Sequence, residues 1–161
     1  MRFLILFFLI IPNILFGQIN IFNGSSPFTK DILCNINNGK LYNGTSSKHE
    51  DIILSISDNK IYLGNRIFSD NILYTFKNNN VYKGSLLYTS NIIINFNENK
   101  LYKETSFYTS DIILSIENNN VYNKNLIYST NIIFNMSGDV SNLELVAILY
   151  FLYGPNFDLT L

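Results

Sequence analysis

The sequence is poor in the side chains on which many enzymes and disulfide-stapled domains depend. Its 161 residues include one cysteine, one histidine and no tryptophan, and only 14% of them are charged. A single cysteine cannot form a disulfide within the chain, and a single histidine leaves little material for a metal site or a catalytic triad. A formal net charge of −1 lacks the basic excess of nucleic-acid-binding domains. We therefore expect no catalytic residues, no metal, no cofactor and no nucleic-acid partner.

Apolar residues and asparagine are abundant instead. The chain is 47% hydrophobic and 15% aromatic, and 26 of its residues are asparagine. This composition is too apolar for a disordered chain. The length suits one domain, which we place at residues 18–161.

The first seventeen residues have the features of a secretory signal peptide. Arg2 is followed by the apolar run of residues 3–11, and Gly17 precedes Gln18. A basic start, a short apolar stretch and a small residue before the cut are typical of such signals. We therefore expect residues 1–17 to direct export through the Sec pathway, to the periplasm or the exterior of a bacterial cell.

A repeat of twenty residues organises the rest of the chain. An aliphatic column is followed directly by an aromatic column. The aliphatic column holds Ile21, Leu41, Ile61, Val81, Leu101 and Val121, and the aromatic column holds Phe22, Tyr42, Tyr62, Tyr82, Tyr102 and Tyr122. A third column contains only aspartate or asparagine, at positions 31, 51, 71, 91, 111 and 131. Six copies of one supersecondary unit follow from this periodicity.

Each repeat predicts one β-hairpin. A longer run alternates as in Ile52, Leu54 and Ile56, and a shorter run follows as in Ile61-Tyr62. Period-two alternation of this kind is the strand signature, and pairs such as Asp58-Asn59 between the runs suit tight turns. If the turn spans four residues, Ile56 faces Ile61 and Ser55 faces Tyr62. Six hairpins give about twelve short strands over residues 19–136.

Residues 141–153 break the repeat and predict a helix. Ser141 and Glu144 form a capping-box pattern, and Gly154-Pro155 is a stop signal. The helix is apolar on all sides and must be buried all round. Because twelve strands leave room inside a barrel, we predict an all-β fold, a closed antiparallel barrel plugged by this helix, with a tail at 154–161. A membrane anchor or a helix buried in a dimer is the alternative.

The predicted architecture resembles two known families. Twelve antiparallel strands around a C-terminal apolar helix resemble the Tubby C-terminal fold, which phospholipid scramblases share. The motifs Ile61-Tyr62-Leu63-Gly64-Asn65 and Val81-Tyr82-Lys83-Gly84-Ser85 are similar to those of the β-flower family of small bacterial proteins. The likeness spans residues 19–153. Tubby proteins bind phosphoinositides through basic side chains, and no matching basic cluster occurs here. The β-flower likeness implies no established activity.

Three features could carry chemistry, and each has a structural interpretation that we favour. His49-Glu50-Asp51 could seed a metal site or a general base, but a polar turn explains it. Cys34 occupies a column predicted to point inward, as a small core residue. The aspartate/asparagine column could supply calcium ligands, but only three of its six members are carboxylates, and turn capping accounts for it.

The aromatic column is the candidate binding face. Phe22, Tyr42, Tyr62, Tyr82, Tyr102 and Tyr122 are expected on the outer face of the barrel, where exposed aromatics mark interaction sites. Cross-strand packing on neighbouring Ser, Thr and Asn residues is the favoured alternative. A second aromatic column, at Phe28, Phe68, Tyr88, Tyr108 and Tyr128, is expected to add an apolar contact to each repeat.

Together these features predict an exported, non-catalytic structural or interaction module. Its partner would be a protein or another envelope component. The alternative function is binding of lipid or of a small apolar ligand, in the manner of a Tubby-like protein, with membrane lipid as a partner. An enzyme built on His49 is the third and weakest hypothesis.

Overall fold

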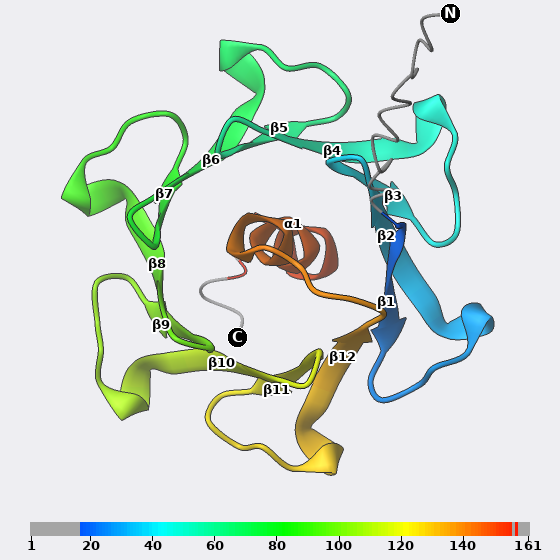
Figure 1. The fold of residues 1–161 in the computed structure, drawn as a ribbon. Coiled ribbons are helices and arrows are strands. Elements are labelled where there is room, and N and C mark those ends of the chain that lie inside the picture. The colour runs from blue at the N-terminus through cyan, green and yellow to red at the C-terminus, as the bar shows by residue number, and fades with distance from the viewer. Residues whose placement is uncertain (1–16, 156, 158–161) are drawn as a thin grey trace, which may run out of the picture.

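Twelve strands form in a computed structural model, as the alternating pattern predicts (Figure 1). The structure describes residues 17–155 and 157, so the predicted signal peptide lies outside the described residues except for Gly17. The strands are β1 (Ile19–Asn23), β2 (Ile32–Asn37), β3 (Lys40–Asn43), β4 (Ile52–Ser57), β5 (Lys60–Leu63), β6 (Ile72–Lys77), β7 (Asn80–Lys83), β8 (Ile92–Asn97), β9 (Lys100–Lys103), β10 (Ile112–Glu117), β11 (Asn120–Asn123) and β12 (Ile132–Met136).

Every strand pairs antiparallel with its sequence neighbours, and the last strand closes the barrel on the first. At the closure β1 pairs with β12, with Ile21 opposite Met136 and Phe22 opposite Asn135. Within the second complete hairpin, Ile56 lies opposite Ile61, as predicted. Closure leaves no sheet edge with unpaired backbone groups.

The hairpin turns use the residues that tolerate left-handed backbone. Asp58 and Asn59 have φ values of 50° and 58°, and Asn78 and Asn79 have 51° and 63°. Two consecutive residues with positive φ define the type I′ turn, which matches the twist of the flanking strands. The prediction of asparagine-based tight turns is confirmed.

A β-bulge interrupts the predicted alternation of the longer strands. Leu41 lies opposite Leu54, but Tyr42 lies opposite Ile52, so Ile53 is the extra residue. The same shift recurs in all six repeats. The extra residues Leu33, Ile53, Leu73, Ile93, Ile113 and Ile133 pack on the core. The prediction of strict alternation across residues 52–56 is therefore wrong at Ile52. The bulge puts two residues opposite one, so Ile52 does not lie on the same face as Leu54.

The inner wall of the barrel is apolar. Its innermost columns are almost completely buried. They comprise the aliphatic column that ends at Val121 and the column of Cys34, Leu54, Tyr74, Ile94, Leu114 and Phe134. Cys34 is a core residue, as predicted, and burial raises the pKa of its thiol to about 12, which keeps it protonated and unreactive.

A single α-helix fills the bore (Figure 1). Helix α1 (Asn142–Tyr153) begins at the predicted capping box, in which the amide N–H of Glu144 donates to Ser141 Oγ at 3.2 Å. Leu145 through Leu149 are buried on every side, so α1 is the predicted plug. No helix in the described part of the chain combines the length and the hydropathy needed to span a membrane.

We expect Ile148→Asp to unfold the protein. Ile148 is fully buried inside the barrel, and an unpaired carboxyl group there would cost roughly 3–5 kcal/mol in addition to the lost apolar burial. Asn142→Asp, at the partly exposed first residue of α1, is the matched control and should leave the thermal midpoint close to that of the parent. A folded Ile148→Asp protein in a thermal melt would refute the plugged barrel.

We also expect Glu104→Gly and Lys124→Gly to stabilise the fold. Four repeats place glycine in this column, whereas Glu104 and Lys124 hold φ values of 51° and 55°. Relief of this left-handed strain should add roughly 0.5–1 kcal/mol at each position. The control is Lys103→Gly, inside β9, which should lower the free energy of unfolding in urea. Destabilisation by all three changes would contradict the strain argument.

Candidate functional site

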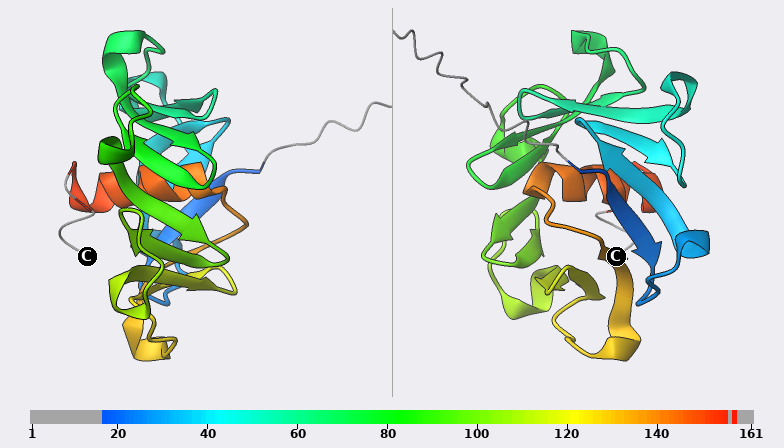
Figure 2. Two further views of the ribbon diagram at one scale, coloured as in Figure 1. Left: turned by 90° about the vertical axis from the view of Figure 1, so that its left-hand side faces the viewer. Right: turned by 45° about the vertical axis from the view of Figure 1, so that its right-hand side comes forward.

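Six loops surround one end of the barrel. We call them petals 1 to 6, and they are residues 24–31, 44–51, 64–71, 84–91, 104–111 and 124–131. Each petal leaves a short strand, makes one turn of 3-10 helix and enters the next strand. Figure 2 shows the petals flaring outward around the end of the barrel from which the C-terminal part of α1 emerges. Petal 2 contains His49-Glu50-Asp51 yet keeps the same shape as the others.

Buried polar residues on the barrel wall hold the petals in place. In one type of petal, a wall asparagine donates to two petal carbonyls. The Nδ2 group of Asn35 donates to the carbonyl oxygens of Gly44 at 2.9 Å and Ser46 at 2.8 Å. Asn95 and Asn135 hold petals 5 and 1 in the same way. In these three petals the residue of the aspartate/asparagine column is an aspartate. A serine of the same petal donates to its carboxylate, as Ser46 Oγ does to Asp51 in petal 2.

In the other type of petal, the wall residue is a serine or threonine. In petals 3 and 4 its hydroxyl reaches only the first petal carbonyl: Ser55 Oγ donates to Gly64 O at 2.7 Å, and Thr75 Oγ1 donates to Gly84 O at 2.8 Å. Behind petal 6, Ser115 Oγ is buried and has no hydrogen-bond partner among the described residues. The second carbonyl is then satisfied from within the petal, since Asn91 Nδ2 donates to Leu86 O at 3.1 Å. Petals 3, 4 and 6 belong to this type, with Asn71, Asn91 and Asn131 as internal donors.

The two types follow one hydrogen-bond rule. A wall asparagine always accompanies a petal aspartate and a petal serine, and a wall serine or threonine always accompanies a petal asparagine. Buried carbonyls need a donor, and each type supplies it from a different side chain. Turn capping, and not a calcium ring, therefore explains the aspartate/asparagine column.

The candidate aromatic face lies outside the barrel wall but is covered. Its six residues are each only 5–9% exposed. They are Phe22, Tyr42, Tyr62, Tyr82, Tyr102 and Tyr122. The petals account for this, as in the ring contact between Phe107 and Tyr102, with centroids 6.0 Å apart. These six residues therefore do not form an exposed aromatic surface, and their burial agrees with the packing interpretation that we favoured.

The exposed apolar residues are at the petal tips instead. The second aromatic column, expected to make apolar contacts, is 61–76% exposed at Phe28, Phe68, Tyr88, Tyr108 and Tyr128. Further exposed side chains precede it at Ile67, Leu86, Leu87, Phe107, Leu126 and Ile127. Sequence analysis missed these residues as a surface. The available signal was a run of two or three apolar residues that belongs to neither strand of its repeat.

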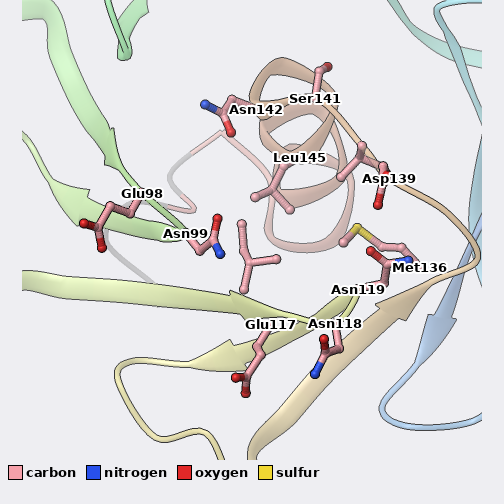
Figure 3. A pocket seen from close by; sticks show the side chains of 12 residues that line it. Glu98, Asn99, Glu117, Asn118, Asn119, Met136, Asp139, Ser141, Asn142 and Leu145 are labelled. Atoms are coloured by element: carbon pink, nitrogen blue, oxygen red, sulfur yellow. The ribbon is translucent and has the colours of Figure 1, made fainter.

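A pocket opens at the opposite end of the barrel, among the hairpin turns (Figure 3). It has a volume of about 300 Å³, and Glu98, Glu117 and Asp139 lie around it on three separate segments. The side chains of Glu98 and Glu117 point away from it (Figure 3). Leu145 and Met136 form its apolar side. Within the described residues, no group of His, Cys, Asp and Glu side chains is placed to hold a metal ion.

A second pocket of about 440 Å³ lies beside the N-terminus of α1. It is lined by Ile19, Ile36 and Glu144, together with Asn38 and Gly39 of the first tight turn. Its lining is mainly apolar.

His49 lies at the tip of petal 2 and contacts the next petal. Its Nε2 atom is paired with the side-chain amide of Asn65. Asp51 is bonded to Ser46, so the three adjacent residues do not converge on one point. This arrangement matches the polar turn that we favoured.

A comparison with protein families matches residues 21–149 to a model described as a 6-fold beta flower protein. No curated protein and no solved structure matches significantly. The matched segment contains strands β2 to β12, most of β1 and most of α1.

The hydrogen-bond rule predicts that substitutions in a petal can restore the stability lost by a substitution in the barrel wall. Asn35→Ser should lose about 1–2 kcal/mol of stability, because Ser46 O loses its donor. Adding Ser46→Leu and Asp51→Asn, which complete the other petal type, should recover most of that loss. The measurement is the free energy of unfolding in urea, compared among the parent, the single variant, the petal variant and their combination in a mutant cycle.

The control for this cycle is Ser26→Leu with Asp31→Asn, the same pair of changes in petal 1. Combined with Asn35→Ser, this pair should recover nothing, because petal 1 is bonded to Asn135. Equal recovery from both petals would refute a petal-specific bond.

Proposed function

The chain belongs to the 6-fold beta flower family, and from this premise we propose that it is an exported, non-catalytic structural or interaction module. The family description names an architecture and no reaction. The observation that best supports the proposal is the contrast between a filled barrel and its exposed petal tips.

The filled barrel supports a structural role. Val146, Ala147, Ile148 and Leu149 have no exposed surface inside the bore. A bore occupied by a helix of the chain itself leaves the outer surface as the place for recognition. Closure and dense packing also make a rigid scaffold.

The most reactive side chains are engaged in structure. Cys34 is buried and protonated, with a pKa of about 12, and His49 is paired with Asn65 at a petal tip. Nucleophilic catalysis needs an accessible thiolate or an activating base beside the nucleophile. These placements support a role without catalysis.

The petal tips support an interaction role. Eleven large apolar side chains are 43–76% exposed on five of the six petals. Monomeric soluble proteins rarely leave so many apolar side chains uncovered in one region unless they contact something.

A second candidate function is binding of lipid or of a small apolar ligand. The pocket beside the N-terminus of α1 favours it, because Ile19 and Ile36 line a volume of about 440 Å³ at the barrel mouth. Apolar concave sites of this size are typical of small-ligand binding.

Native mass spectrometry of the chain released by an exporting bacterial host tests these proposals. We expect the mass of residues 18–161, with no ligand attached, because the leader is removed and the bore is already filled. A mass that retains residues 1–17 would contradict export by this signal. A discrete added mass that is lost on collisional activation would favour the ligand-binding alternative.

A further inference from the structure

The exposed apolar side chains are concentrated on one side of the ring of petals. Petals 4, 5 and 6 carry eight of the eleven, petal 3 carries two and petal 1 carries one. The eight are Leu86, Leu87, Tyr88, Phe107, Tyr108, Leu126, Ile127 and Tyr128. Petal 2 carries none, and it lies across the barrel from petal 5 (Figure 1).

Charge follows the opposite distribution. Petal 2 presents Lys48, His49 and Glu50, all exposed. Petal 4 has no charged residue, and petal 6 has only Lys124. In petal 5 the carboxylate of Asp111 accepts a hydrogen bond from Ser106, which leaves Glu104 as its one free charge. The ring therefore has an apolar edge, petals 4–6, and a polar edge, petal 2.

The petals of the apolar edge point outward from the barrel (Figure 1), and the space between petals 4 and 5 is polar. The pocket between petals 4 and 5 is lined by Thr89, Ser90, Glu104 and Thr105, with Ile92 and Ile93 behind them. A bound helix or peptide needs the reverse, namely an apolar groove that receives its side chains. Separate apolar tips suit a fluid apolar phase that can surround each of them.

The side-chain types also fit a membrane interface. Each of these petals places a tyrosine next to leucine, isoleucine or phenylalanine. Tyrosine prefers the boundary between headgroups and acyl chains, and aliphatic side chains prefer the region just below it. Petals 4–6 together carry Glu104, Asp111 and Lys124, without the basic excess that anionic lipids attract.

We infer that petals 4–6 insert their tips into the interface of an electrically neutral bilayer, with petal 2 held in water on the far side. This inference rests on the proposed interaction function and names its partner as a phospholipid surface. The acyl boundary would contact Leu87, Tyr108 and Ile127, one from each petal. Binding would depend weakly on salt, because no charge pairing drives it.

The absence of tryptophan allows a site-specific test. Tyr108→Trp reports on the apolar edge, and Lys48→Trp reports on the polar edge. The two positions occupy the same column of the repeat, and both side chains are exposed, so neither change should disturb folding. Each variant of the full chain is mixed with phosphatidylcholine vesicles whose acyl chains carry bromine, a contact quencher.

The expected result is a one-sided response. Emission of Tyr108→Trp should shift to shorter wavelength and lose intensity with brominated vesicles, whereas Lys48→Trp should change in neither respect. Equal responses, or none, would overturn the inference. A shift of Tyr108→Trp without vesicles that grows with protein concentration would show that a second copy covers this edge, and would also overturn it.

Serine variants supply the matched controls. Leu87→Ser in petal 4 should weaken vesicle binding by about tenfold, whereas Phe28→Ser in petal 1 should change it little. An equal effect of both would contradict an edge at petals 4–6. If vesicles give no response and the chain is a bare monomer in native mass spectra, the membrane inference fails while the proposed module stands.

Discussion

Burial of one helix inside twelve strands is the constraint on which the rest of the structure depends. A barrel of about eight strands is filled by its own side chains, and a wider one needs additional material. Helix α1 supplies it with leucine, valine, alanine and isoleucine on every face. The wall adapts because a helix has no six-fold symmetry. Inward positions equivalent in the repeat hold side chains as different as Cys34 and Tyr74, and the Tyr74 hydroxyl donates to Pro155 O at 3.1 Å just beyond the end of α1.

The wall has a second task on its outer side, where it orients the petals. The bulge in each longer strand makes both tasks possible. It puts Ile53 and Leu54 together against the core, and it leaves Ser55 on the outer side, where its hydroxyl reaches Gly64. A regular strand would keep strict alternation. Ile52 would then face the core, whereas the bulge lets it lie beside its partner Tyr42 on the outside of the barrel.

Local patterns in the sequence predict most of this architecture. Period-two runs, asparagine pairs and the capping box at Ser141 each act within a few residues, so they identify strands, turns and the helix. The bulges depend on how one strand pairs with the next, which alternation alone does not show. The exposure of the two aromatic columns also could not be predicted. Tyr102 and Tyr108 are six residues apart in one repeat, and only the path of petal 5 determines which of them is covered.

Wall and surface are coupled through the column of the repeat that begins at Ser26, and this coupling decides whether a petal can carry an apolar side chain at that position. Where the wall residue is asparagine, the petal aspartate requires a serine at this position, as in Ser26, Ser46 and Ser106. Where the wall residue is serine or threonine, the petal asparagine bonds the backbone, and the side chain at this position is free. Arginine or leucine then occupies it, at Arg66, Leu86 and Leu126. The buried choice between asparagine and serine or threonine thus decides whether this one position is tied to the aspartate or can carry another side chain. Leu86 and Leu126 extend the apolar tips of petals 4 and 6, where Asn91 and Asn131 donate to their backbone carbonyls and leave the side chains free.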